Sequence, residues 1–218
     1  MVVYIRHADD NNKHTKHKHD PHITKRGMHN VKKTTKELIS KYGCPDTIYV
    51  SPFRRCVDTV KIMVNEINNI NNNNKINVIC DVNLSRYFSK SDKKHPRVSK
   101  TTLDYNVPIY ETKREFHKRI NNHINETVKT EKSHNENIVW CITHALVYKN
   151  IAKKLHVSTN DRIDFLEYFS YNHHKHTNID DGPIPIDQLL PEQLDPDNPE
   201  YVPMVKRFGV NKNIGNPL

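Results

Sequence analysis

The chain has 218 residues, of which 35% are hydrophobic, and its formal net charge is +9 at pH 7. This length is that of one domain with an extension or of two small domains, and the charge favours anionic partners such as phosphate esters, nucleic acids or acidic lipids. No run approaches the ~20 apolar residues of a membrane span, and the charge at Arg6 comes too early for a signal peptide, so we expect a soluble, intracellular, cytoplasmic protein.

The apolar residues gather in short runs that alternate with helical patterns. In chain order, the pattern predicts a strand at 2–5, a helix at 25–42 capped by Thr24, a strand at 47–50, a helix from 53 to about 70, a strand at 76–80, a helix from about 112 to 130, a strand at 138–142, a helix at 145–155 and a strand near 163–169. Residues 81–109 lack periodicity and are expected to be irregular. Such alternation predicts an α/β fold, a three-layer α/β/α domain with a mostly parallel central sheet.

The composition changes near Tyr171, where prolines begin to interrupt every possible element. We therefore expect a folded domain over 1–170 and a Pro-rich C-terminal extension over 171–218.

Cysteines and clustered histidines are the residues that most often hold metals. The cysteines form no CxxC pair, and most lie in or beside apolar runs, which favours buried free thiols at Cys44, Cys56, Cys80 and Cys141. No rigid element spaces the histidines, which favours solvated loops over a metal site at His14, His17, His19, His22, His173, His174 and His176.

Short segments that contain arginine or histidine, here called islands, directly follow three of the predicted strands. They are residues 6–8, 51–56 and 143–145. The carboxyl ends of parallel strands meet at one edge of a sheet, which is where open α/β sheets bind ligands. We therefore expect the arginines and histidines of these islands to share one site.

These residue types fit phosphoryl transfer. A neutral imidazole such as His7 can attack phosphorus, while the guanidinium groups of Arg6 and Arg55 match the phosphate oxygens. His144, when protonated, would add a further donor. If His7 must be neutral to attack, activity should fall on the acid side near the imidazole pKa.

Four motifs carry a family resemblance: Val3-Tyr4-Ile5-Arg6-His7-Ala8, the segment from Asp20 to Gly27 that enters the first helix, Ser51-Pro52-Phe53-Arg54-Arg55-Cys56-Val57-Asp58-Thr59, and Cys141-Ile142-Thr143-His144-Ala145. Over roughly residues 2–170 the chain resembles the histidine phosphatase superfamily, which has the phosphoglycerate-mutase-like fold. The resemblance implies His7 as the catalytic nucleophile, with Arg6, Arg55 (rather than Arg54) and His144 as the phosphate-binding pocket. It also implies a phosphohistidine that is hydrolysed without a metal or other cofactor.

The sequence departs from the family pattern where many members carry a proton-donating Glu, because Arg86 occupies that position. A cation cannot protonate a leaving alkoxide, so the donor is missing or lies elsewhere, with Asp81, Asp10 and Glu111 as candidates. Ala145 excludes the Asp that another branch places after its second histidine. The departure argues against a phosphoglycerate mutase and favours good leaving groups, such as aryl phosphates, or phosphoproteins.

We therefore predict a histidine phosphatase, a metal-independent phosphoric monoester hydrolase whose partner is a phosphorylated small molecule or a phosphoprotein. One alternative is a protein of the same fold that binds phosphate but has lost turnover along with the acid. A basic nucleic-acid-binding protein is a weaker alternative, because no aromatic residues are interleaved with the basic loops. The sequence predicts neither the natural substrate nor the oligomeric state.

Overall fold

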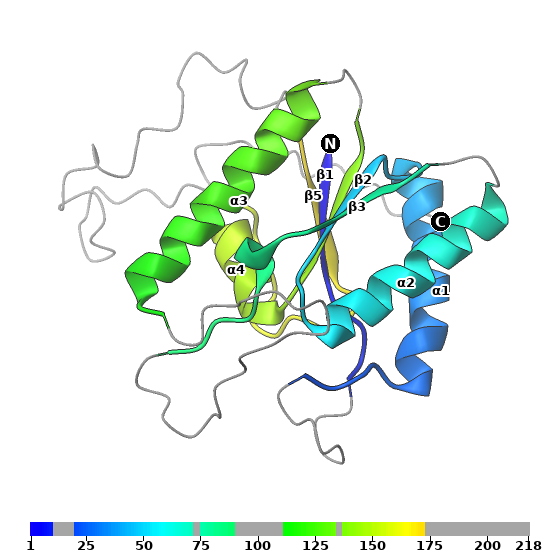
Figure 1. Cartoon of the computed structure of the whole chain (residues 1–218), viewed down its shortest axis with the longest axis horizontal. Helices are drawn as coiled ribbons and strands as arrows, with labels where there is room; N and C mark the ends of the chain where they lie inside the picture. Colours follow the sequence, from blue (N-terminus) through cyan, green and yellow to red (C-terminus); the bar gives the residue numbers. More distant parts are fainter. Residues whose placement is uncertain (11–19, 72–74, 90–110, 134–136, 173–218) are drawn as a thin grey trace, which may run out of the picture. The chain divides into compact units, whose positions relative to one another are not determined.

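The apolar runs form one sheet of five strands in the part of the chain that the structure describes (Figure 1). The structure is a computed structural model and describes residues 1–10, 20–71, 75–89, 111–133 and 137–172. The strands are β1 (Val2–Arg6), β2 (Thr47–Val50), β3 (Asn77–Cys80), β4 (Val139–Thr143) and β5 (Tyr168–Tyr171). Their spatial order is β3-β2-β4-β1-β5, so β4 lies between β1 and β2. The first four are parallel, and β5 pairs antiparallel with β1.

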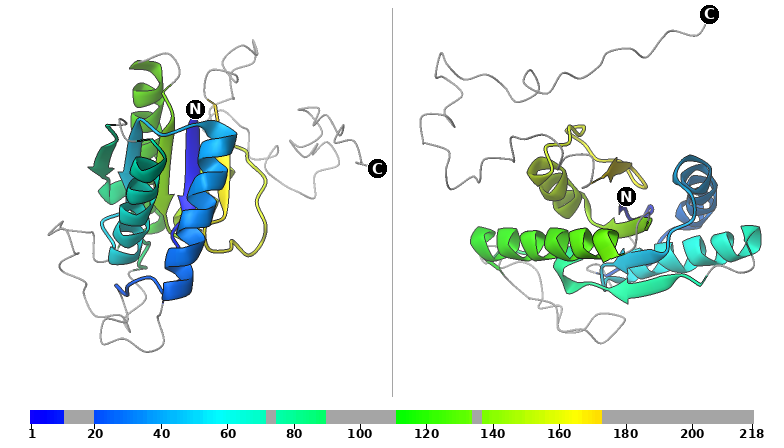
Figure 2. Two further views of the ribbon diagram at one scale, coloured as in Figure 1. Left: turned by 90° about the vertical axis from the view of Figure 1, so that its right-hand side faces the viewer. Right: turned by 90° about the horizontal axis from the view of Figure 1, so that it is seen from above.

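Helices cover both faces of the sheet. They are α1 (Lys25–Tyr42), α2 (Arg54–Ile70), α3 (Lys113–Ser133) and α4 (Ala145–Lys154), with a short 3-10 turn, η1 (Val82–Leu84), after β3. Figure 2 shows α1 and α2 on one side of the sheet and α3 and α4 on the other. The predicted three-layer α/β/α fold with a mostly parallel sheet is therefore confirmed. None of the helices within the described ranges has the length and apolar character needed to cross a membrane.

Alternation along the strands builds a separate core on each face. In β1, Val3 and Ile5 pack into the cluster under α1 and α2, whereas Val2 and Tyr4 pack into the cluster under α3 and α4. All four side chains are fully buried. Because successive side chains of a strand point to opposite faces, a strand covered on both sides must be apolar throughout. This explains why the central strands β1, β2 and β4 are nearly continuous apolar runs in the sequence.

The last strand begins later than the sequence pattern predicts. The prediction placed it near 163–169, whereas β5 spans Tyr168–Tyr171. The reason is a turn before the strand, in which Leu166 has a φ of 62°, a value that no strand adopts. Phe165, which the pattern placed inside the strand, therefore lies in this turn.

The first turn of α1 anchors the loop that leaves β1. Thr24 caps the helix, its Oγ1 accepting a hydrogen bond from the Gly27 N–H at 2.9 Å. The Thr24 N–H donates to the carbonyl oxygen of Asp9 at 2.8 Å. A Cβ on Gly27 would lie 2.7 Å from that same carbonyl oxygen, so the close approach requires glycine. The residues that follow His7 are thus held against a helix terminus.

Several sequence-based expectations lie outside the described residues. These are the histidine run at 14–19, most of the irregular segment 81–109, and the extension over 171–218 apart from Tyr171 and Asn172. None of the four cysteines is in a disulfide, as expected, but only Cys56 and Cys141 are buried. Cys44, between α1 and β2, and Cys80, the last residue of β3, are partly exposed, which corrects the expectation that all four are buried. In the described ranges no three His, Cys, Asp or Glu side chains gather as a metal site would require.

Candidate active site

Four side chains named from the sequence meet at the carboxyl ends of the three central strands. Arg6 ends β1 and His7 follows it, Arg55 is in the first turn of α2 after β2, and His144 caps α4 after β4. His7 and His144 are each 4% exposed, and Arg55 is 3% exposed. The two imidazole centroids are 5.2 Å apart. The structure therefore brings together the residues that the sequence pattern assigned to one site.

Arg55 lies between the two imidazoles. Its Nε donates to His7 Nε2 at 3.1 Å and to His144 Nδ1 at 3.3 Å, and its Nη2 is 3.0 Å from His144 Nδ1. Arg54, the alternative arginine of the motif, instead donates its backbone N–H to Asp20 Oδ1 at 2.6 Å. A buried guanidinium that lies between two imidazoles is suited to holding an anion beside them.

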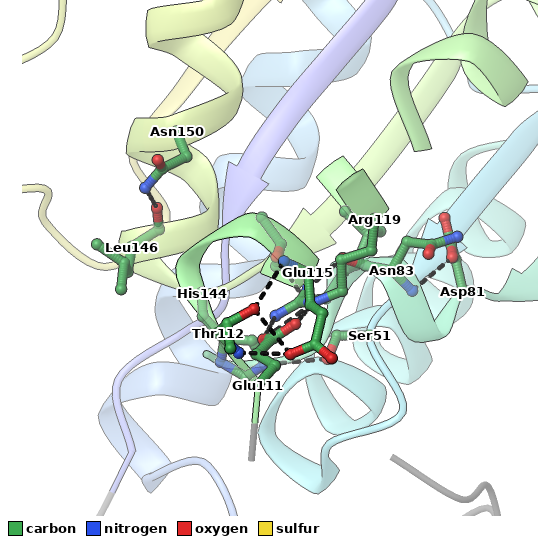
Figure 3. A network of polar contacts seen from close by, with 12 residues as sticks. Ser51, Asp81, Asn83, Glu111, Thr112, Glu115, Arg119, His144, Leu146 and Asn150 are labelled. Carbon is green, nitrogen blue, oxygen red and sulfur yellow. Dashed lines mark hydrogen bonds and ion pairs between the residues drawn. The ribbon is translucent and has the colours of Figure 1, made fainter. Parts of the chain in front are cut away.

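Hydrogen-bond partners define the tautomer of each histidine. His7 Nδ1 is 2.8 Å from the carbonyl oxygen of Ala8, which can only accept, so Nδ1 carries the hydrogen and Nε2 keeps its lone pair. His144 Nδ1 accepts from Arg55, so its Nε2 carries the hydrogen and donates to Ser51 Oγ at 2.9 Å (Figure 3). The nucleophilic nitrogen of His7 therefore faces Arg55.

Burial keeps both imidazoles neutral. Removal from water, and then the charge of Arg55, lowers the pKa of His7 well below its ordinary value. The same two causes lower the pKa of His144. An imidazole that stays neutral below its ordinary pKa is ready to attack phosphorus. The fall in activity on the acid side of the pH profile should therefore lie below the ordinary imidazole pKa. His144 becomes a donor through Nδ1 only if a nearby anion raises its pKa again.

Arg6 has an unused donor. Its Nη1 donates to the carbonyl oxygen of Ile163, and its Cζ lies 4.0 Å from the ring centroid of Phe165. Its Nε is buried and has no hydrogen-bond partner among the residues that the structure describes. Buried N–H groups without a partner are rare and costly, so this donor is suited to an anionic ligand.

Two of the three candidate acids are held by basic partners on α3. Asp81 Oδ2 lies 2.6 Å from Nδ1 of the buried His123, and Asp81 Oδ1 accepts from the Asn83 N–H at 2.8 Å. Burial raises the pKa of Asp81, but these contacts outweigh it and leave the pKa below its ordinary value. Glu111 receives three hydrogen bonds of 2.6 to 3.1 Å from Arg119. Both carboxylates are therefore engaged with partners on α3.

Asp10 is the candidate acid that lies at the cluster. Its Oδ2 is 3.5 Å from Arg55 Nε, and its side chain is 5% exposed. Burial raises the pKa of Asp10, although the charges of Arg55 and Arg6 oppose this. A carboxyl group with a raised pKa beside the nucleophile can hold and release a proton.

Arg86, at the position where the family pattern has Glu, also lies near the cluster. It is partly buried, and its Cζ lies 5.2 Å from the ring centroid of Phe88. Its charge contributes to lowering the pKa values of both His7 and His144. The departure from the family pattern thus adds a cation to the site.

Two further residues at the site were not given a role from the sequence. Thr59 Oγ1 accepts from the Ala8 N–H at 3.1 Å and donates to the Arg55 carbonyl oxygen at 2.7 Å, which ties the loop after β1 to α2. Thr59 is the last residue of the motif that begins at Ser51, and this position could have indicated a role for it. Phe165 lies 5.7 Å from His7 between ring centroids, and no local pattern marked it.

Comparisons with known proteins agree with this fold. The family model described as histidine phosphatase superfamily (branch 1) matches residues 2–178. The structure of an ecdysone phosphate phosphatase from Bombix mori, in complex with tungstate, has a TM-score of 0.54 at 15% identity and covers 77% of this chain and 86% of that chain. A mycobacterial glucosyl-3-phosphoglycerate phosphatase in complex with VO3 has a TM-score of 0.54 at 15% identity, covering 77% of this chain and 88% of that chain. The sequence matches no curated protein at a significant level.

Proposed function

Because the chain belongs to the histidine phosphatase superfamily (branch 1), we propose that it hydrolyses phosphomonoesters through a phosphohistidine on His7. The observation that carries the proposal is the buried Arg55 guanidinium within 3.1 Å of His7 Nε2 and 3.0 Å of His144 Nδ1. A phosphoryl group beside His7 Nε2 would have cationic donors around its oxygens, which is the arrangement that phosphoryl transfer requires.

In the first step, the lone pair of His7 Nε2 forms a bond to phosphorus while the bond from phosphorus to the leaving oxygen breaks. Arg55, the Nε of Arg6, which has no partner in the described ranges, and a protonated His144 balance the charge on the remaining oxygens. In the second step, water attacks the phosphohistidine, the bond from phosphorus to nitrogen breaks, and inorganic phosphate leaves. His7 returns to its neutral form, so the cycle consumes only the ester and water.

Asp10 is the proton donor in this proposal. A phosphate dianion beside the carboxyl group raises its pKa further, because a second negative charge nearby disfavours ionisation. Substrate binding therefore favours a protonated Asp10, which gives its proton to the leaving oxygen and takes one from water in the second step. The partners of Asp81 and Glu111 on α3 leave Asp10 as the best placed of the three carboxylates.

The test of the proposal compares the wild type with His7→Ala on p-nitrophenyl phosphate, with His29→Ala, an exposed histidine of α1, as the matched control. We expect His7→Ala to lose roughly 10³-fold or more in kcat/KM, because the nucleophile is removed, and His29→Ala to match the wild type. Acid quenching with a labelled substrate should trap a phosphoenzyme in the wild type and none in His7→Ala.

Equal rates for the wild type and His7→Ala would refute the proposal. Phosphate binding that persists without any turnover would then favour the alternative, a phosphate-binding protein of the same fold.

A further inference from the structure

Phe165 presents an exposed aromatic surface beside the proposed phosphate site. Its ring centroid lies 4.0 Å from Arg6 Cζ and 5.7 Å from the His7 ring centroid. The side chain is 38% exposed, whereas the other two phenylalanines near the cluster, Phe53 and Phe88, are at most 6% exposed. Isolated exposed apolar residues are common on protein surfaces, so the significance of Phe165 lies in its position and not in its exposure.

The turn that carries Phe165 is strained and fastened to β1. Leu166 has a φ of 62°, a conformation that a bulky side chain rarely adopts. The Leu166 N–H donates to the Arg6 carbonyl oxygen at 3.2 Å, and the Arg6 N–H donates to the Glu167 carbonyl oxygen at 2.9 Å. Strain of this kind persists only where surrounding contacts maintain it, and it concentrates at binding and catalytic sites. The fold therefore holds the Phe165 ring at a defined place over Arg6.

We propose that Phe165 is a platform for an aromatic leaving group, and that aryl phosphomonoesters are the preferred substrates. This inference rests on the proposed function, because it takes His7 as the position of the phosphoryl group. With the phosphate oxygens held by Arg6 and Arg55, the group bonded to phosphorus emerges beside Phe165. Aromatic rings attract each other in offset or edge-to-face arrangements at centroid separations of roughly 4.5 to 7 Å.

The chemistry of the leaving group agrees with this assignment. A phenol ionises with an ordinary pKa of about 10, so its anion leaves with far less help from an acid than an alkoxide does. Arg86, in place of the proton-donating Glu, can stabilise such an anion by its charge.

The test measures binding of three non-hydrolysable anions by titration calorimetry: phenylphosphonate, methylphosphonate and inorganic phosphate. We compare the wild type with Phe165→Ala and Phe165→Tyr. The matched control is Ile70→Ala, which removes a side chain that is 49% exposed at the far end of α2, roughly 22 Å along the helix from Arg55. Thermal unfolding of each variant checks that the fold is retained.

We expect Phe165→Ala to weaken phenylphosphonate about tenfold, and methylphosphonate and phosphate less than about twofold. Phe165→Tyr, which keeps the ring, and Ile70→Ala should both bind like the wild type. An equal loss for all three anions would overturn the inference, because Phe165 would then serve only to support Arg6. Unchanged phenylphosphonate binding in Phe165→Ala would overturn it as well.

Turnover separates this inference from the proposed function. If the wild type binds phenylphosphonate through Phe165 but hydrolyses no ester, the platform stands and the proposed function fails. If the wild type hydrolyses phenyl phosphate and glycerol 2-phosphate, and Phe165→Ala lowers both rates equally, the platform fails and the proposed function stands.

Discussion

Arg55 shows how one side chain organises the proposed site. Its Nε is shared among His7 Nε2, His144 Nδ1 and Asp10 Oδ2 at 3.1, 3.3 and 3.5 Å. A guanidinium that is 3% exposed requires a compensating negative charge, which Asp10 supplies. In the proposed mechanism, a phosphate bound to Arg55 meets that requirement, and its negative charge favours the uptake of a proton by Asp10. The same contact therefore stabilises the buried cation and prepares the acid.

Replacing Asp10 tests this role through the leaving group. We expect Asp10→Asn to lower kcat about 10²-fold or more on glycerol 2-phosphate, because an alkoxide must be protonated as it leaves. The loss on p-nitrophenyl phosphate should be less than about tenfold, because p-nitrophenolate leaves without a proton. Asp161→Asn, at an exposed position, is the control. Equal losses on the two substrates would show that Asp10 acts on Arg55 and does not donate the proton.

At the scale of elements, the start of α1 positions the loop after β1. The Asp9 carboxylate accepts from Thr24 Oγ1 at 3.1 Å and from Arg26 Nη2 at 2.8 Å, while its backbone lies against Gly27. Negative charge near a helix N-terminus is favourable, so the loop and the helix stabilise each other. Since this loop also carries His7 and Asp10, the packing of α1 reaches the proposed site.

Gly27→Ala should disturb this contact. Its Cβ would lie 2.7 Å from the Asp9 carbonyl oxygen, so the backbone of the loop must move. We expect a loss of about 1–3 kcal/mol in the free energy of unfolding, measured with urea, together with a lower kcat/KM. Asn30→Ala, on the exposed face of the same helix, should change neither quantity by much. A Gly27→Ala variant as stable and active as Asn30→Ala would contradict this account.

At the scale of the whole molecule, burying two neutral imidazoles makes stability depend on pH. The pKa values of His7 and His144 are lowered on folding, by burial first and by Arg55 second. Below the unfolded pKa of about 6.5, the unfolded chain takes up protons that the folded chain does not. Stability should therefore be fully present above pH 6.5 and fall as the pH drops toward the lowered folded values.

We expect the free energy of unfolding to fall by about 1 kcal/mol for each of the two histidines between pH 6.5 and 5.5, because the unfolded histidine is only half protonated at pH 6.5. His144→Asn should reduce that slope by about half of the imidazole contribution, whereas the exposed His29→Asn should leave it unchanged. Asp10, whose pKa is raised by burial, acts in the opposite sense, so slopes are compared between variants. Urea unfolding in phosphate-free buffer measures them, and identical slopes for all three proteins would refute the explanation.

The predicted division of the chain into a domain and an extension depends on residues outside the described ranges. We continue to propose that residues 1–170 form the phosphatase domain and that 171–218 form a Pro-rich extension. The family model extends slightly further, to residue 178.

Much of the fold was predictable because its signals are local. Each central strand is an apolar run of four or five residues, and each of the three islands directly follows one. α1 was predictable at both ends, since Thr24 caps its start and Gly43, with a φ of 90°, ends it. The family motifs then identified Arg55 in preference to Arg54.

The sequence by itself determined which residues stand at strand ends, because hydrophobic alternation and capping act over a few neighbouring residues. Only the tertiary structure placed β4 between β1 and β2, and with it His144 beside both His7 and Arg55. It likewise paired Asp81 and Glu111 with α3 and turned Phe165 toward Arg6. These contacts join residues far apart in the chain, and long-range packing has no counterpart in the local pattern from which the elements were predicted.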